Sequence, residues 1–126
     1  MVENLLSFTV RQVTPFIRVI DLNGEIGTHS EKPLNDGFAQ AGGNNVQTIV
    51  FNFSGVTYMN SFGIGMLIML FIRAQREGKK IFGFGLNEHY RNIFQLTRLD
   101  QVIPIYSTEA VALASAQPFD LPERES

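Results

Sequence analysis

Cysteine and tryptophan are both absent from the 126 residues of this chain. Without cysteine the chain forms no disulfide bond and has no thiolate chemistry. Its aromatic content is mainly 11 phenylalanines, whose rings need no polar partner when they are buried. With 44% hydrophobic and 17% charged residues, the composition is typical of a packed globular protein with a phenylalanine-rich core.

Strong charge of either sign and long apolar runs are also missing. The formal net charge is −2 and no basic cluster stands out, so we expect no direct binding to nucleic acid. The longest apolar run, FGIGMLIMLFI (62–72), is shorter than the ~18–20 residues that cross a membrane. The N-terminal MVENLLSFTVRQ has no basic segment followed by an apolar one, so it is not a secretory signal. We therefore expect a soluble cytoplasmic protein that does not bind membranes.

The length fits one domain, which we place at residues 1–116. Residues 117–126 are expected to form a flexible tail, because QPFDLPERES combines two prolines with several charges. Apolar stretches bounded by turn residues predict five strands, at 8–13, 16–22, 46–53, 79–85 and 101–106. Helical spacing and end signals predict four helices, at about 28–43, 61–77, 87–99 and 107–116. The alternation after residue 46 indicates parallel strands with right-handed crossovers. The predicted fold class is α/β, with a mixed central sheet of four to five strands covered by about four helices.

Local signals mark the ends of these elements. Asn23–Gly24 is typical of a turn, and Pro104 favours an edge position for the last strand. The expected N-caps are Thr28 or Ser30 for the first helix, Asn87 for the third, and Ser107 or Thr108 for the fourth. In the first helix, Leu34, Phe38 and Ala41 are spaced to share one buried face.

Residues for catalysis or cofactor binding do not form a recognisable group. His29 and His89 are isolated, without a second ligand at helical spacing, so no metal site is expected. No glycine-rich run ends in Gly-Lys-Ser or Gly-Lys-Thr, so there is no phosphate-binding loop of that kind. A receiver domain that accepts phosphate on aspartate would need a carboxylate where the strand VFNF carries Asn52. We therefore expect a protein that is not an enzyme and uses no cofactor.

The helix expected after Ser61 is apolar on two sides. At roughly 100° per residue, the face expected to pack on the sheet carries Ile64, Leu67, Ile68, Phe71 and Ile72. The opposite side, where polar residues ordinarily lie, carries Phe62, Met66, Met69, Leu70 and Arg73. Either the rest of the domain or a partner protein covers this second side. The methionines slightly favour a partner, because their side chains adapt to varied partner shapes. Gly63 and Gly65 are expected to let the helix approach a neighbouring backbone closely.

Ser61 has two interpretations that the residues alone leave open. As an N-cap, its hydroxyl would accept a hydrogen bond from a first-turn N–H group and contribute roughly 1 kcal/mol. As a modification site, it would place a phosphate against free N–H groups at the positive end of the helix macrodipole. Nucleophilic catalysis by Ser61 is not expected, because the neighbouring Asn60 and Thr57 are not bases.

Two stretches, IVFNFSGVTYMNSFGIGMLIML and REGKKIFGFGLNEHYRNIFQLTRLDQVIPIYSTEAVAL, resemble the STAS domain of bacterial anti-sigma factor antagonists. The resemblance runs from VIDLNGEI to about Ala112, in the family's order of strands and helices. NSFG (60–63) occupies the place of the family's Asp-Ser-Ser/Thr-Gly-like tetrad, and GEI (24–26) matches its Gly-Glu-Leu turn. This resemblance implies a single STAS-type domain.

The resemblance also implies a binding switch centred on Ser61. In the family, the tetrad's first serine is phosphorylated by an anti-sigma factor that is a GHKL-type serine kinase, and a PP2C-type phosphatase reverses the modification. The unphosphorylated antagonist binds the kinase and frees a sigma factor. By position, Ser61 is the phosphoacceptor, and the partner-binding residues are Gly24, Thr57, Met59, Asn60, Phe62, Gly63, Met66, Met69 and Arg73. The resemblance also implies that the loop expected at 55–60 belongs to the contact surface, with the loop expected at 23–27 beside it. Formation of a homodimer is left open.

Three residues depart from the family pattern. Asn60 replaces the acidic residue that usually precedes the serine, Gly27 stands where the family often has Asp, and Phe62 replaces a small hydroxyl residue. The first two changes lessen the repulsion of a phosphate on Ser61, and the third removes a second acceptor. Two other functions are left open: a non-switching STAS scaffold in a signalling or transport assembly, with Ser61 only a cap, and a small-ligand protein that binds an anion at the helix N-terminus.

Overall fold

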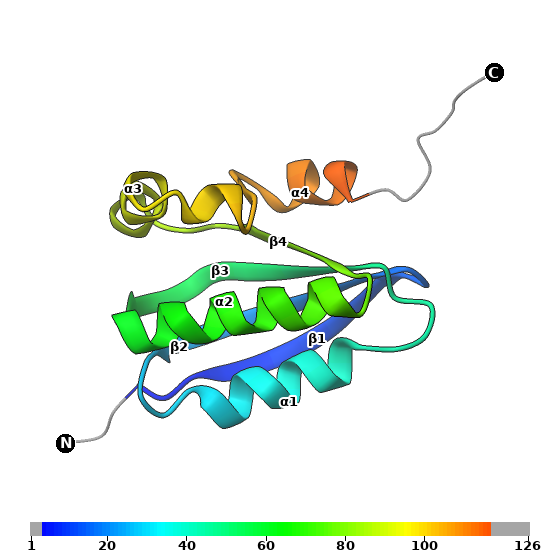
Figure 1. The fold of residues 1–126 in the computed structure, drawn as a ribbon, viewed down its shortest axis with the longest axis horizontal. Helices are drawn as coiled ribbons and strands as arrows, with labels where there is room; N and C mark the ends of the chain where they lie inside the picture. Colours follow the sequence, from blue (N-terminus) through cyan, green and yellow to red (C-terminus); the bar gives the residue numbers. More distant parts are fainter. Residues whose placement is uncertain (1–3, 117–126) are drawn as a thin grey trace.

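The computed structural model describes residues 4–116, which fold as a five-stranded sheet with four α-helices (Figure 1). The strands are β1 (Ser7–Thr14), β2 (Ile17–Ile26), β3 (Thr48–Met59), β4 (Lys80–Phe84) and β5 (Ile105–Tyr106). The helices are α1 (Glu31–Ala41), α2 (Ser61–Arg76), α3 (Glu88–Leu96) and α4 (Glu109–Ser115), with a short 3-10 turn at Leu99–Gln101. The predicted mixed α/β fold is therefore confirmed. The tail expected at 117–126 lies outside the described residues.

The strand order is the chain order, β1-β2-β3-β4-β5. Strand β1 is antiparallel to β2, and each later neighbouring pair is parallel. This matches the alternation of strands and helices in the sequence, because a parallel neighbour requires a crossover connection. Strands β1 and β5 form the two edges of the sheet, and Pro104 predicted this for the last strand.

The two faces of the sheet carry separate apolar clusters, because successive side chains of a strand point to opposite faces. Helices α1 and α2 lie side by side over one face and pack on a cluster that includes Ile20, Phe51 and Ile81. Helix α4 lies on the other face, over Val19, Val50 and Phe82. Helix α3 adds Tyr90 and Phe94 to the first cluster. The expected phenylalanine-rich core is present.

Two of the sequence predictions about strand ends are wrong. No turn forms at Asn23–Gly24, because β2 continues through it to Ile26. Strand β3 likewise runs to Met59, so the loop expected at 55–60 is largely strand. The two strands stay paired to their ends through register shifts. Gly24 lies at one of these register shifts and has a φ of 111°, which glycine adopts readily. A Cβ at this position would lie 2.5 Å from the carbonyl oxygen of Leu5, so a larger residue would not fit.

The strand expected at 101–106 is also shorter than predicted. Only Ile105–Tyr106 pairs with β4, and the chain before it forms the 3-10 turn. Pro104 cannot donate a hydrogen bond to a ladder, although its carbonyl oxygen accepts one from the Gly83 N–H at 2.8 Å. Ile103 is buried without being in a strand, so its hydrophobicity was misread as a strand signal.

Most predicted helix ends are confirmed. Asn87 caps α3 and Thr108 caps α4, each accepting a hydrogen bond from a first-turn N–H. Ser30 stands at the N-cap of α1 without making a side-chain cap bond. Its hydroxyl instead accepts from the Gly27 N–H at 2.8 Å and donates to the Glu25 carbonyl at 3.1 Å. Ser30 thus fastens the link between β2 and α1.

Candidate functional site

Helix α2 begins beside the carboxyl ends of β2 and β3, and its cap is Asn60 rather than Ser61. Asn60 has extended backbone angles, and its side-chain oxygen accepts a hydrogen bond from the Gly63 N–H at 2.9 Å. Ser61 is therefore the first helical residue, and the interpretation of Ser61 as the cap is wrong. An asparagine just before a helix satisfies a first-turn N–H, so the exposed Ser61 is not required for this task.

Gly63 places the first turn of α2 directly on the end of β2. A Cβ at Gly63 would overlap the carbonyl oxygen of Ile26 and lie 2.7 Å from its carbonyl carbon. The Asn60 N–H donates to the same carbonyl oxygen at 3.2 Å. The close approach predicted for Gly63 is present. The same prediction for Gly65 is wrong, because a Cβ there would meet nothing within 4 Å.

The buried face of α2 differs from the predicted one. Gly63, Leu67, Leu70 and Ala74 are buried, so Leu70 faces the core rather than the outer side. Ile72, predicted to face the sheet, is 37% exposed. Because both sides of the helix are apolar, hydrophobicity alone could not identify the side that packs on the sheet. The close contact between Gly63 and Ile26 determines which side of α2 is buried.

The outward side of α2 is a stripe that starts one residue after Ser61. Phe62 is 52% exposed and Met69 is 65% exposed, and Met66 between them is half-buried. Their spacing of four and three residues places them on one face of the helix. Phe62 and Met69 are therefore open to solvent, whereas Met66 also packs partly against the core. The sequence had left open whether the domain itself or a partner covers this side.

The other residues predicted to bind a partner lie in different environments. Thr57 is exposed, and its hydroxyl donates to the Gly24 carbonyl oxygen at 3.4 Å. Met59 is buried, and its N–H donates to the Tyr90 hydroxyl at 2.9 Å. The side chain of Met59 therefore belongs to the core and not to the surface around Ser61.

A shallow hollow of about 280 Å³ adjoins Asn60. It is lined by Asn4, Leu5, Glu25, Gly27, Thr28, His29, Ser30, Tyr58 and Asn60. Two exposed members of this lining, Leu5 (58% exposed) and Tyr58 (48% exposed), were not among the residues predicted from the sequence. Tyr58 was overlooked because the segment was expected to be a loop, whereas it is the end of β3.

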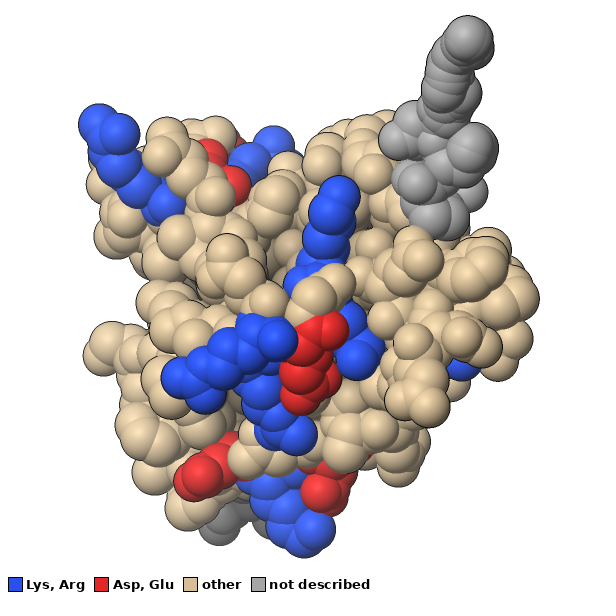
Figure 2. Space-filling model, turned by 45° about the vertical axis from the view of Figure 1, so that its right-hand side comes forward, with Lys and Arg blue, Asp and Glu red and all other residues tan. Residues whose placement is uncertain are grey.

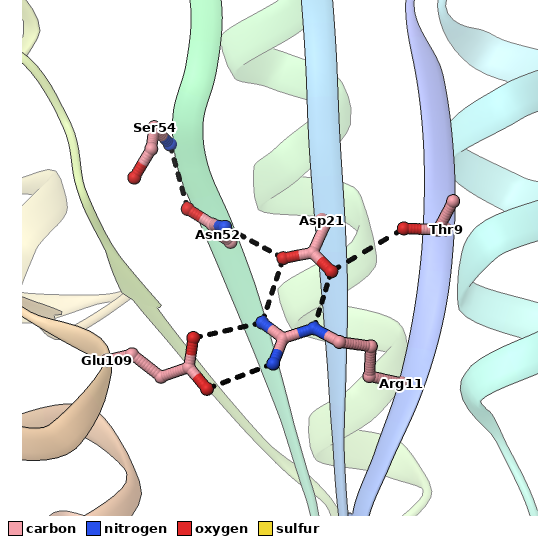
Figure 3. Close-up of polar contacts among 6 residues, drawn as sticks. All are labelled: Thr9, Arg11, Asp21, Asn52, Ser54 and Glu109. Carbon is pink, nitrogen blue, oxygen red and sulfur yellow. Dashed lines mark hydrogen bonds and ion pairs between the residues drawn. The ribbon is translucent and has the colours of Figure 1, made fainter.

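A polar network occupies the opposite face of the sheet (Figure 3). The Arg11 guanidinium pairs with Asp21 at 2.6 Å and with Glu109 of α4 at 3.0 Å. Asn52 donates to Asp21 at 2.7 Å and accepts from the Ser54 N–H at 2.9 Å. Hydrogen bonds from Arg11, joined by that from Asn52, hold the pKa of Asp21 below its ordinary value, although partial burial acts in the other direction. The network fastens α4 to β1, β2 and β3.

Neither a metal-binding group nor a membrane-spanning helix is found within residues 4–116. No three histidine, cysteine or acidic side chains come together there in a way that could hold a metal ion. None of the helices in this part of the chain is long and apolar enough to cross a membrane.

The model of the STAS domain family matches residues 9–112. The chain therefore belongs to the STAS domain family. The mixed five-stranded sheet with four helices agrees with this assignment.

Solved structures with the same fold include small regulatory proteins and part of a transporter. Bacillus SpoIIAA in its phosphorylated form is 23% identical, with a TM-score of 0.65 over 88% of this chain and 100% of that chain. An anti-sigma factor antagonist from Mycobacterium paratuberculosis is 21% identical, with a TM-score of 0.74 over 87% of this chain and 92% of that chain. Murine Slc26a9, an anion transporter, is 16% identical, with a TM-score of 0.71 over 90% of this chain but 22% of that chain. At these identities the likeness shows the fold alone.

Proposed function

We propose that this protein is an anti-sigma factor antagonist, a non-catalytic regulator whose switch is phosphorylation of Ser61. It binds an anti-sigma factor that is a GHKL-type serine kinase and so releases a sigma factor, and a PP2C-type phosphatase restores the unphosphorylated state. The observation that carries the proposal is an exposed serine at the first position of α2, next to the exposed Phe62. SpoIIAA, which has the same fold, is an anti-sigma factor antagonist.

The start of α2 suits a phosphate on Ser61. Because Asn60 caps the helix, the serine hydroxyl is not needed to hold the first turn. The first N–H groups of a helix have no partner within it, and the macrodipole is positive at this end. No acidic residue lies in the first turn of α2, and Asn60 itself is uncharged. A phosphate that adds about −1.5 to −2 charges therefore meets no carboxylate within its own helix turn, and α2 remains folded.

The phosphate would act on the partner rather than on the domain. Phe62 and Tyr58 expose large rings on either side of Ser61 in the sequence, and a bound protein would cover them. Burying a phosphate in such an interface requires its desolvation, which opposes binding. The antagonist would therefore bind its partner when Ser61 is free and release it when Ser61 is phosphorylated.

Intact-mass analysis tests the modification directly. After incubation with the cognate GHKL kinase and ATP, the wild-type chain should gain one phosphate and Ser61→Ala none. Ser107→Ala removes another exposed serine, before α4, and should gain one phosphate like the wild type. An unmodified wild-type chain, or a phosphate retained by Ser61→Ala, would refute the assignment.

A second candidate function is a non-switching scaffold in a larger assembly, favoured by the fold shared with the anion transporter Slc26a9. Binding measurements distinguish this scaffold role from the switch. The kinase is used without nucleotide, so that it cannot phosphorylate the chain. Under the switch proposal, Ser61→Ala binds it as the wild type does, and Ser61→Asp binds at least about tenfold more weakly, a loss of roughly 1.4 kcal/mol. Aspartate in a first turn interacts well with the macrodipole, so the fold should be retained. A non-switching scaffold would bind equally well with either substitution.

A further inference from the structure

A groove of about 310 Å³ lies between α1 and α2, on the side of the sheet away from the polar network. It is lined by Glu31, Leu34, Asn35, Met66, Met69, Leu70, Ile72, Arg73 and Arg76. On the face seen in Figure 2, basic side chains lie near the centre, with acidic side chains directly beside them. The groove thus combines an apolar lining with charge at its ends.

The floor of the groove is rigid and its rim is adaptable. Leu34 and Leu70 are 2% and 3% exposed, so they form part of the packed core. Met66 is half-buried and Met69 is 65% exposed. Methionine side chains are unbranched and flexible, and they fit apolar surfaces of different shapes. Such a lining suits large aliphatic side chains of a partner.

The two ends of the groove carry opposite charges. Glu31 lies in the first turn of α1, whereas Arg73 stacks over Phe38, further along that helix, with its Cζ atom 4.9 Å from the ring centroid. Arg73 is also held by Glu77, with Nε and Oε2 3.7 Å apart. Arg76 makes no ion pair with another residue of the described part of the chain. A positively charged end that is not neutralised internally is complementary to a carboxylate of a partner.

We propose that this groove receives an amphipathic helix of the anti-sigma partner, whose apolar residues lie on Leu34, Met66 and Met69 and whose carboxylates face Arg73 and Arg76. The inference rests on the proposed function and specifies the partner's chemistry. A helix is the appropriate occupant, because a groove between two helices offers side-chain ridges and no free strand edge for main-chain pairing.

The groove continues the surface around Ser61. Phe62, Met66 and Met69 form one stripe along α2, so a partner that covers Phe62 reaches the groove without a gap. Ser61 and Arg76 are 15 residues apart in one helix, about 22 Å. This distance exceeds a Debye length of about 8 Å at physiological salt. A phosphate on Ser61 therefore leaves the basic end unneutralised and adds negative charge at the opposite end of the stripe.

The occupant can be tested with a defined peptide. The probe is a stapled helical peptide with leucines at i, i+4 and i+7 and glutamates between them; its control has lysine for every glutamate. In the full chain with ¹³C-methyl methionine, the acidic peptide should shift the Met66 and Met69 signals and leave that of the buried Met59 unchanged. Equal shifts with both peptides, or no shift of Met66 and Met69, would overturn the proposal.

A charge-reversal pair tests the basic end. Arg76→Glu should weaken binding of the acidic peptide by about three- to tenfold, and the difference should shrink at high salt because exposed charges are screened. Lys80→Glu makes the same charge change on the opposite face of the sheet, since Lys80 alternates with Ile81 of the α2 side, and should bind as the wild type does. Equal binding by the two variants, or Arg76-dependent binding to anionic lipid vesicles with none to the peptide, would overturn the inference.

The cognate kinase separates this inference from the proposed function. If the kinase phosphorylates Ser61 but binds Arg76→Glu and Lys80→Glu equally well, the groove assignment is wrong and the switch stands. If Ser61 is never phosphorylated, the proposed function fails, whatever the peptide does. Phosphorylation of Ser61 together with selectively weaker binding by Arg76→Glu supports both.

Discussion

Gly63 is the position at which a single methyl group tests how α2 is seated. The substitution Gly63→Ala places a Cβ in overlap with the carbonyl oxygen of Ile26, a backbone atom that cannot rotate away. To accept it, the first turn of α2 must move off the end of β2. That movement would strain the hydrogen bond from the Asn60 N–H to the same carbonyl, 3.2 Å long.

The size of the effect follows from two opposing terms. Overpacking a tight contact costs about 1–3 kcal/mol, whereas replacing glycine by alanine inside a helix stabilises it by up to about 1 kcal/mol. At Gly63 the first term exceeds the second, so we expect a net loss of about 1–2 kcal/mol in the free energy of unfolding. A methyl group at Gly65 would meet nothing within 4 Å, so Gly65→Ala should gain about 0.5–1 kcal/mol.

Urea unfolding followed by circular dichroism measures both variants against the wild type. We expect the midpoint of Gly63→Ala to fall and that of Gly65→Ala to rise, with unchanged slopes, because the surface exposed on unfolding is nearly the same. Equal midpoints for the two variants would show that the close contact between α2 and β2 does not exist as described.

Two further predictions concern buried or partly buried polar groups. The lowered pKa of Asp21 means that its ion pair with Arg11 stabilises the fold above the unfolded pKa of about 4, and this contribution is lost as pH falls through the folded pKa. Asp21→Asn should therefore lower the urea midpoint at neutral pH, and the difference from the wild type should shrink as pH falls below about 4; a difference that does not change with pH would refute the pairing. Tyr90→Phe leaves the buried N–H of Met59 without its acceptor, so the free energy of unfolding should fall by about 1–3 kcal/mol. An unchanged urea midpoint would show that this hydrogen bond does not stabilise the fold.

The order of strands and helices and the amphipathic face of α1 could be predicted from local patterns in the chain. Leu34, Phe38 and Ala41 are all buried as predicted, because a helix with one apolar face can pack in only one orientation. The cap at Asn87 was equally predictable, since capping depends on residues three positions apart. The resemblance of NSFG to the STAS tetrad pointed to the family before any contact was known.

Features that depend on distant parts of the chain could be recognised only in the folded domain. Helix α2 is apolar on both sides, so its inner face was fixed by the contact between Gly63 and Ile26 of β2. Arg11 and Glu109 are 98 positions apart in the sequence, and no local pattern relates them. Periodicity and capping act within a few residues, whereas a backbone contact or an ion pair between layers exists only after the sheet has brought its strands together.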